Sequence, residues 1–169
     1  MSNSDTPITC ADIPVGKTVT VKVPASSANL GPGYDTLGLA LGFYDELRVE
    51  RISEGLEFEL SGEGSEAVPR DETHLVIQAM RSTFEKVRLH DFPDLRLTAH
   101  NRIPHSRGMG SSASAIVAGV AAASGLLPEH AQLSRDQILQ VASDLEGHPD
   151  NVAPSVYGSL SISWGELGN

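Results

Sequence analysis

The most informative run of residues in this chain is Pro104-His105-Ser106-Arg107-Gly108-Met109-Gly110-Ser111-Ser112-Ala113-Ser114, which leads directly into a segment of small apolar residues. Two glycines one residue apart let the backbone bend where a Cβ would clash, and the serines that follow open a helix. The first N–H groups of a helix have no partner within it, and they lie at the positive end of its dipole. The run therefore predicts a cradle for an anion such as phosphate, with serine hydroxyls able to reach a phosphate oxygen or its cation.

Three other interpretations compete with the phosphate cradle. The run could be a simple helix cap, in which a serine hydroxyl only satisfies a backbone donor. It also fits a dinucleotide-binding pattern, since Gly108, Gly110 and Ala113 satisfy G-x-G-x-x-A. Glu129 stands about where a ribose-binding acid belongs, but that pattern needs a buried strand leading straight into the first glycine, and residues 104–107 intervene. A Walker-type loop is excluded because no lysine follows the second glycine.

The charge of the chain limits its partners. The 169 residues carry a net charge of −10, with 12 Lys and Arg against 22 Asp and Glu. This surplus argues against a broad nucleic-acid surface or an anionic-membrane surface, so we expect neither partner. A phosphate ligand must then be held by a local group of donors, and a basic cluster of Arg102, His105 and Arg107 flanks the glycines.

Several features favour a cytoplasmic protein of one domain. Residues 1–12 are polar and lack an apolar core segment, so no signal peptide is predicted. The single Cys10 cannot form a disulfide within the chain, which agrees with a reducing compartment. The apolar run from Ala115 to Ala123 falls short of the ~20 residues that cross a bilayer and is expected to be a buried helix.

The first half of the chain alternates between apolar and polar residues in the manner of strands. Val19, Val21 and Val23 predict a strand that ends at Pro24. Residues 25–35 are dense in turn formers, and we interpret them either as a plain loop or as a loop that lines a site. The elements expected next are a short strand or turn over residues 37–41, a strand over 47–52, and its hairpin partner over 56–60.

Apolar residues recur at helical spacing in the second half. The expected elements are a helix over 75–87 with Thr73 as its cap, a strand from Leu95 to Asn101, a helix over 111–124, a helix opened by the capping box at Ser134 and stopped by Gly147 and Pro149, and a final strand over 159–164. Strands and helices interleave irregularly, and strands are paired early. The α+β class is therefore preferred to a doubly wound α/β fold.

Three motifs together resemble the GHMP small-molecule kinases, and within that superfamily the homoserine kinases. The superfamily loop Pro-x-x-x-Gly-Leu-Gly-Ser-Ser-Ala-Ala is kept over residues 104–113, with Met109 in place of leucine and Ser114 in place of the last alanine. Methionine for leucine conserves volume. The stretches 26–41 and 146–151 are similar to homoserine kinases in particular, whereas mevalonate kinases and galactokinases share only the loop.

The resemblance implies a fold and a domain division. We expect residues 1–169 to form the GHMP-kinase N-terminal ATP-binding domain, a mixed sheet covered by helices with a left-handed βαβ unit, an exception to the usual crossover rule. Members of the family are longer, and their second half supplies a further glycine-rich motif and arginines that hold the carboxylate of homoserine. The expectation is therefore that the C-terminal domain of the family is absent from this sequence.

The resemblance also implies an activity, the ATP-dependent phosphorylation of the side-chain hydroxyl of L-homoserine to O-phospho-L-homoserine, on the way to threonine. ATP and Mg²⁺ are the expected cofactors, L-homoserine is the expected partner, and a homodimer is left open. Ser112 would place its hydroxyl on Mg²⁺ and Glu146 its carboxylate, so both are expected metal ligands. The residues implied in homoserine binding are Asn29, Asp35, His148, Asp150 and Asn151. The alternatives are an NAD(P)-binding oxidoreductase domain and a non-catalytic fragment.

Asp150 stands where related kinases place an aspartate proposed as general base, usually with a lysine partner. No matching lysine is evident, since the lysines are Lys17, Lys22 and Lys86. Our hypothesis is that Asp150 orients the acceptor and that the hydroxyl proton leaves late, to phosphate or solvent. Asp150, Glu146 and Ser112 are thus the expected catalytic residues.

The adenine contact rests on one position. Relatives often carry Asn-Leu-Val where this chain has His74-Leu75-Val76, so His74 either contacts adenine or is a surface residue at a helix start. The residues implied in ATP binding are His74 and all of Pro104, His105, Ser106, Arg107, Gly108, Met109, Gly110, Ser111, Ser112, Ala113 and Ser114. None of His74, His105 and His148 is expected to bind a metal, because no Cys or paired His stands at ligand spacing.

Overall fold

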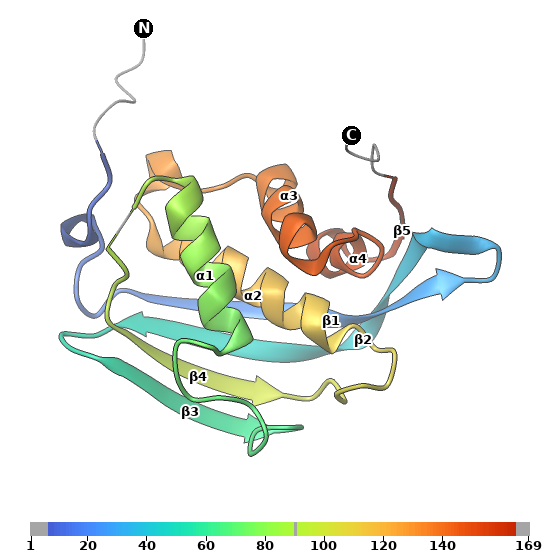
Figure 1. The fold of residues 1–169 in the computed structure, drawn as a ribbon, viewed down its shortest axis with the longest axis horizontal. Coiled ribbons are helices and arrows are strands. Elements are labelled where there is room, and N and C mark those ends of the chain that lie inside the picture. Colours follow the sequence, from blue (N-terminus) through green and yellow to red (C-terminus); the bar gives the residue numbers. More distant parts are fainter. Residues whose placement is uncertain (1–6, 90, 165–169) are drawn as a thin grey trace, which may run out of the picture.

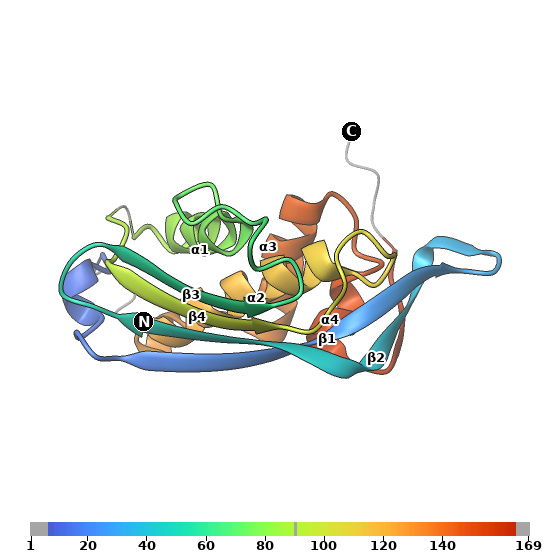
Figure 2. The same ribbon diagram turned by 90° about the horizontal axis from the view of Figure 1, so that it is seen from below.

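The computed structural model describes residues 7–89 and 91–164, so the polar segment expected at residues 1–6 lies outside the described residues. In the described part, one mixed sheet carries helices on one face (Figures 1 and 2), which confirms the α+β class. The strands are β1 (Thr18–Leu30), β2 (Gly33–Arg51), β3 (Leu56–Gly62), β4 (Leu95–Asn101) and β5 (Leu160–Ile162). The α-helices are α1 (Leu75–Lys86), α2 (Ser111–Leu126), α3 (Arg135–Glu146) and α4 (Val152–Tyr157), with short 3-10 turns at Cys10–Asp12 and Glu129–Ala131.

The strand order β1-β2-β4-β3 corrects one predicted pairing. β3 is not the hairpin partner of β2; it pairs in parallel with β4, which lies between them and is antiparallel to β2. The reason lies in β4, whose Leu95, Leu97 and Ala99 are buried beneath the helices and whose position is therefore central. Alternation alone identifies strands but does not choose their neighbours.

The β3–α1–β4 unit is left-handed. In Figures 1 and 2, α1 lies over the helical face of the sheet while β3 and β4 run in the same direction. Viewed with both strands pointing up and α1 in front, β4 lies to the left of β3. The expected exception to the right-handed crossover rule is therefore present.

The loop predicted over residues 25–35 is instead the far part of a long hairpin. β1 and β2 continue past the helices as an arm, which we define as residues 25–40, and Ser26 pairs with Ala40 in it (Figure 1). Pro24 does not end the strand because β1 is an edge strand and its register shifts between Pro24 and Ser26, and an edge or a bulge tolerates a missing N–H. β5 pairs with β2 in this region, over a shorter span than the predicted 159–164.

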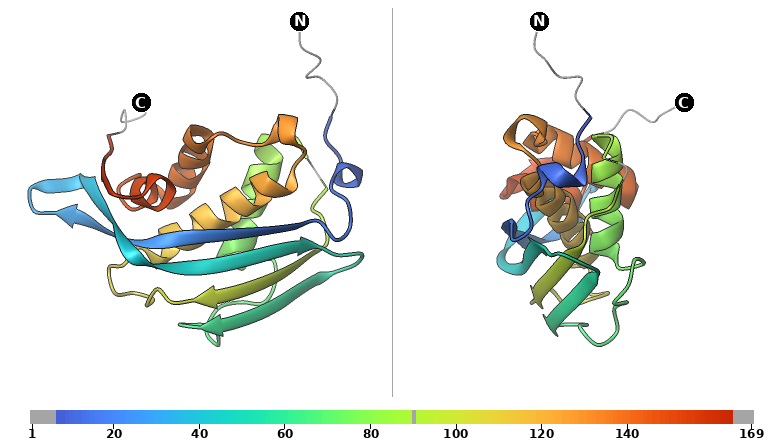
Figure 3. Two further views of the ribbon diagram at one scale, coloured as in Figure 1. Left: turned by 180° about the vertical axis from the view of Figure 1, so that it is seen from behind. Right: turned by 90° about the vertical axis from the view of Figure 1, so that its left-hand side faces the viewer.

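The core lies between the sheet and α1 and α2. α2 is buried along most of its length, as its small side chains predict, and a Cβ on Gly119 would lie 2.7 Å from the Val76 carbonyl oxygen, so the two helices approach closely. The opposite face of the sheet, seen in Figure 3, carries ion pairs such as Arg96 with Glu57 at 2.7 Å. These charges suit a solvated face.

Of the remaining two α-helices, the sequence predicted α3 but not α4. α3 begins at the predicted capping box, in which the Ser134 hydroxyl accepts from the Gln137 N–H, and ends at Gly147 with φ 92°. α4 was not predicted, because it is short and contains Pro154. Within the part of the chain that the structure describes, we find no helix with the length and apolar character needed to span a membrane.

Candidate functional site

The predicted anion cradle is a nine-residue loop, residues 102–110, between β4 and α2. Ser106, Gly108 and Gly110 all have positive φ, at 56°, 68° and 67°, so the loop repeatedly enters the left-handed region. Gly110 is the N-cap of α2 and offers no side-chain cap, so the cap interpretation based on a serine hydroxyl is wrong. Such turns before a helix N-terminus leave backbone N–H groups pointing toward one space, as anion-binding loops do.

Asp45 of β2 anchors the start of this loop, and the sequence analysis missed it. Its Oδ1 accepts hydrogen bonds from the backbone N–H groups of Arg102 (2.6 Å) and Ile103 (2.9 Å). Its Oδ2 lies 3.5 Å from the Ser114 hydroxyl inside α2. No local pattern marks Asp45, because its partners lie far along the chain.

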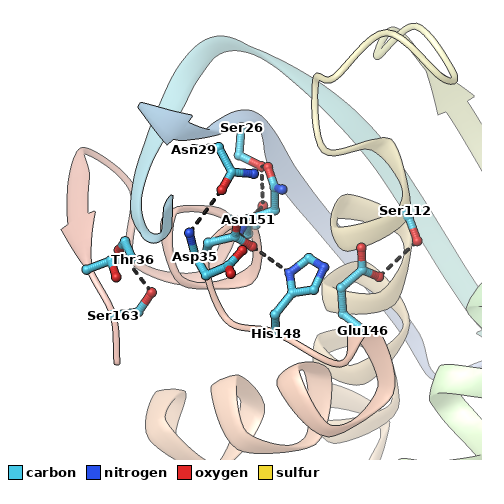
Figure 4. Close-up of polar contacts among 11 residues, drawn as sticks. Ser26, Asn29, Asp35, Thr36, Ser112, Glu146, His148, Asn151 and Ser163 are labelled. Carbon is cyan, nitrogen blue, oxygen red and sulfur yellow. Dashed lines mark hydrogen bonds and ion pairs between the residues drawn. The ribbon is translucent and has the colours of Figure 1, made fainter. Parts of the chain in front are cut away.

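Ser112 and Glu146 are brought together from different helices. The Ser112 hydroxyl, in the first turn of α2, donates to Glu146 Oε2 at 2.9 Å (Figure 4). Glu146 is the last residue of α3, where its negative charge gains nothing from the helix dipole. The contact joins the first turn of α2 to the end of α3.

A cavity of about 320 Å³ opens beside the loop. Its walls come from β2, the start of α1 and the first turns of α2, and are largely apolar. Of the residues expected to bind ATP, those that line it are His74, His105, Ser106, Ser111, Ser112 and Ser114. The others do not line this cavity: Pro104, Arg107, Gly108, Met109, Gly110 and Ala113.

His74 is a buried residue at the start of α1, so the surface interpretation is wrong. Its Nδ1 accepts from the Val76 N–H at 3.2 Å, which makes His74 and not Thr73 the helix cap, and its ring centroid lies 5.4 Å from that of Phe58. Burial lowers the pKa of His74 from its ordinary value of 6.5, and the charge of Asp71 opposes this shift.

The arm contributes Asn29 and Asp35, which contact each other across its tip. Asn29 Oδ1 accepts from the Asp35 N–H at 2.9 Å, and both residues have positive φ, at 58° and 54°. Both side chains are exposed. Left-handed backbone is uncommon outside glycine, and Asn and Asp tolerate it better than most residues.

Ser26 connects the arm to both other parts of the site, and the sequence analysis did not single it out. Its N–H donates to the carbonyl of Met109 at 3.1 Å, and its hydroxyl donates to Asn151 Oδ1 at 3.0 Å. Gly38 lets the arm approach, because a Cβ there would overlap the carbonyl oxygen of Asp150. Only its place inside the motif 26–41 could have identified Ser26 beforehand.

His148 and Asp150 form a second contact on this side. His148 Nδ1 lies 2.6 Å from Asp150 Oδ1, which also accepts the Asn151 N–H at 2.8 Å. Asp150 is fully buried, which differs from the expectation of a carboxylate presented to a substrate. Two of the lysines have other partners: Lys17 donates to the carbonyl of Leu127, and Lys22 pairs with Glu46.

The dinucleotide interpretation fails on geometry. β4 ends at Asn101, so no strand leads straight into Gly108. Glu129 lies in a 3-10 turn and not at the end of a second strand. The next described strand, β5, pairs with β2 and does not neighbour β4, as a dinucleotide fold would require.

Comparison with known proteins gives an independent result. Residues 74–159 match the protein family described as GHMP kinases N terminal domain. The chain is 56% identical over 153 residues to a homoserine kinase of Corynebacterium aurimucosum, covering 90% of this chain and 49% of that protein. It is 55% identical over 150 residues to one of Leifsonia xyli, covering 88% and 46%. The chain thus spans about half the length of the curated relatives it matches.

Two solved kinase structures resemble the fold of this chain. The homoserine kinase of Cytophaga hutchinsonii superposes with a TM-score of 0.75 at 27% identity, covering 88% of this chain and 49% of that one. The mevalonate kinase of Methanococcus jannaschii superposes with a TM-score of 0.66 at 16% identity, covering 87% and 53%. The second likeness bears on the fold alone.

Proposed function

This chain belongs to the GHMP kinase family, and from that premise we propose that its site transfers the γ-phosphoryl group of ATP to the side-chain hydroxyl of L-homoserine. The product would be O-phospho-L-homoserine, an intermediate of threonine biosynthesis in the cytoplasm. The observation that carries the proposal is the 2.9 Å contact between Ser112 and Glu146, which joins the phosphate loop to the end of α3. The curated relatives named homoserine kinase support the choice of acceptor.

The cavity and the loop together suit a nucleoside triphosphate. The apolar wall beside His74 and Val76 has room for a base, and the polar rim at Ser111 and Ser112 suits phosphate oxygens. In a chain of net charge −10, backbone N–H groups at the start of α2 supply the positive potential that a triphosphate needs. ATP in this cavity would place its phosphates at Ser112.

The pair Ser112 and Glu146 fits Mg²⁺. A hydroxyl oxygen and a carboxylate oxygen from different segments lie close together and face the loop, and Mg²⁺ takes such oxygens while keeping the rest of its shell for water and phosphate. The ion, when bound, would neutralise charge on the phosphates. Phosphoryl transfer needs positioning and charge neutralisation more than covalent help, and the loop together with this pair would supply both to the phosphates.

On the acceptor side, the proposed homoserine contacts are Asn29, Asp35, His148 and Asn151. A carboxylate such as Asp35 can pair with the substrate ammonium, and amide side chains can orient its hydroxyl. Ser26 holds Asn151 at 3.0 Å and the phosphate loop at 3.1 Å, which brings the acceptor residues up to the loop.

One observation favours a second possibility, a non-catalytic fragment. Leu160 and Ile162 of β5 are 60% and 62% exposed, and adjacent exposed apolar side chains are the kind of surface that another part of a larger protein covers. A coupled assay for ADP release with homoserine, on this chain and on one extended to the length of its relatives, separates the two. Turnover by the longer chain only would support the fragment; no homoserine-dependent ADP release from either would contradict the kinase.

A further inference from the structure

Asp45 is an acidic residue at a position where the sheet faces the helices. Side chains alternate along a strand, so Asp45, Leu47 and Val49 of β2 point to the same face, and Leu47 and Val49 are buried in the core. Asp45 also lines the cavity that we assign to ATP. A negative charge there is unfavourable toward a triphosphate, so the charge of Asp45 does not explain its place. Its hydrogen bonds are the feature to explain.

The carboxylate of Asp45 continues the sheet at the point where the pairing of β2 with β4 stops. That pairing ends with Glu46 opposite His100, while the backbone of Asp45 stays paired with β1. Oδ1 of Asp45 then accepts the N–H groups of Arg102 at 2.6 Å and Ile103 at 2.9 Å, the first two residues after β4. The phosphate loop therefore begins on a side chain whose own backbone is fixed in the sheet.

The far end of the loop is held by the sheet as well. The Met109 carbonyl accepts the N–H of Ser26 in β1 at 3.1 Å, and Oδ2 of Asp45 lies 3.5 Å from the Ser114 hydroxyl in α2. Ser114 is fully buried, where a hydroxyl without a partner is costly. Asp45 thus contacts both the start of the loop and the helix that follows it.

A purely structural role for Asp45, the ending of β4, would need fewer contacts. The other end of β4 shows this, because there, within the described residues, the Asp94 carboxylate accepts one backbone N–H, that of Gly55 at 2.9 Å. The Asp45 carboxylate instead spans the loop on which the anion cradle depends. The direction of N–H groups in such a loop follows the backbone closely, so a shift of either end would turn them away from a shared ligand.

We propose that Asp45 is a positioning residue for the phosphates, which sets the direction of the N–H groups in the loop and in the first turn of α2. This inference rests on the proposed function, since it takes the ligand of the loop to be the triphosphate of ATP. Asp45 itself touches no phosphate and acts through the backbone that it holds. Its oxygen positions matter and its charge does not.

Amide NMR of this chain without any ligand tests the geometry. Asp45→Ala should shift the signals of Arg102 and Ile103, which lose their acceptor, and also those of residues 108–112. Asp94→Ala is the matched control, because it also removes a carboxylate that accepts a backbone N–H, and it should leave residues 108–112 unchanged. If Asp45→Ala leaves these signals unchanged too, Asp45 only ends the strand and the inference is wrong.

Calorimetric titration with ATP and Mg²⁺, below the unfolding midpoints of the variants, tests the role. Asp45→Ala should lower the affinity by about 10-fold to 100-fold, as loss of a group that orients a binding group does. Asp94→Ala should lose stability but keep the native affinity. A merely structural role of Asp45 would lower stability in both variants and affinity in neither.

Two further variants separate geometry from charge, and they decide the matter if Asp45→Ala does not fold. Asp45→Asn keeps an oxygen that can accept both N–H groups, so it should bind ATP nearly as well as the native chain. Asp45→Glu keeps the charge but moves the carboxylate by a methylene group, so its affinity should fall. The reverse order would overturn this inference but not the kinase. If the native chain binds no ATP, the proposed kinase function fails, and the NMR comparison still decides whether Asp45 sets the loop.

Discussion

The two sides of the candidate site differ in the groups that form them: one consists mainly of backbone N–H groups and the other of side chains. The phosphate side, residues 102–114 with Glu146, depends on backbone: a loop that enters the left-handed region three times and the free N–H groups of one helix. The acceptor side, the arm with residues 148–151, depends on side chains from segments more than 100 positions apart. The first should therefore be sensitive to an added Cβ and the second to a changed functional group.

The two sides meet at Ser26. A substitution that displaces Ser26 should therefore have the largest effect on stability and on ATP binding. Gly110→Ala places a Cβ at φ 67°, which costs about 1–2 kcal/mol of strain, and that Cβ overlaps the Ser26 hydroxyl. Gly108→Ala is the matched control, because its φ is 68° but nothing lies within 4 Å of the added atom. Urea unfolding should show a larger loss of stability for Gly110→Ala, and its ATP affinity should fall further. Equal losses would mean that Ser26 does not connect the two sides.

A substitution at the tip of the arm should have an effect of intermediate size on stability and on KM for homoserine. Asn29→Ala removes the acceptor of the Asp35 N–H and leaves alanine at φ 58°, at a cost of about 1–2 kcal/mol. KM for homoserine should rise while KM for ATP stays constant, because the arm tip belongs to the acceptor side. Asn29→Gly tolerates the backbone but lacks the acceptor, so it should recover stability without recovering KM. A change in KM for ATP would contradict the separation of the two sides.

The smallest expected effect concerns His74 and pH. Its folded pKa lies below the ordinary 6.5, so as pH falls through 6.5 the unfolded chain binds the proton first and stability declines. The decline should level off below the folded pKa. His74→Asn keeps a capping side chain and should remove this part of the pH dependence, as measured by unfolding midpoints between pH 5 and 8. A native chain with no decline over this interval would contradict the lowered pKa.

The contrast between the sides also explains what the sequence could predict. The loop before α2, α2 itself and the capping box at Ser134 are contiguous signals in the sequence, and each of these elements lies where it was expected. Glu146 required the family resemblance, because nothing local shows that the end of α3 faces Ser112. Asp45 and Ser26 were missed for the same reason.

Two further errors arose from local rules that the fold overrides. Pro24 and the turn formers after it indicate a loop, but an edge strand with a register shift accommodates them, so the arm was missed. The pairing of β3 with β4 depends on a crossover through α1 and is invisible to alternation. The burial of Asp150 is a tertiary property that motif spacing does not contain.

Calorimetric titration of this chain with ATP, with and without Mg²⁺, tests the central claim most directly. We predict that ATP binds more tightly with Mg²⁺, that NAD does not compete, and that Ser112→Ala and Glu146→Gln each reduce the Mg²⁺-dependent gain by about 10-fold or more while Asp144→Asn does not. The contradicting result is an ATP affinity that is the same with and without Mg²⁺, or one that is unchanged when Glu146 is replaced.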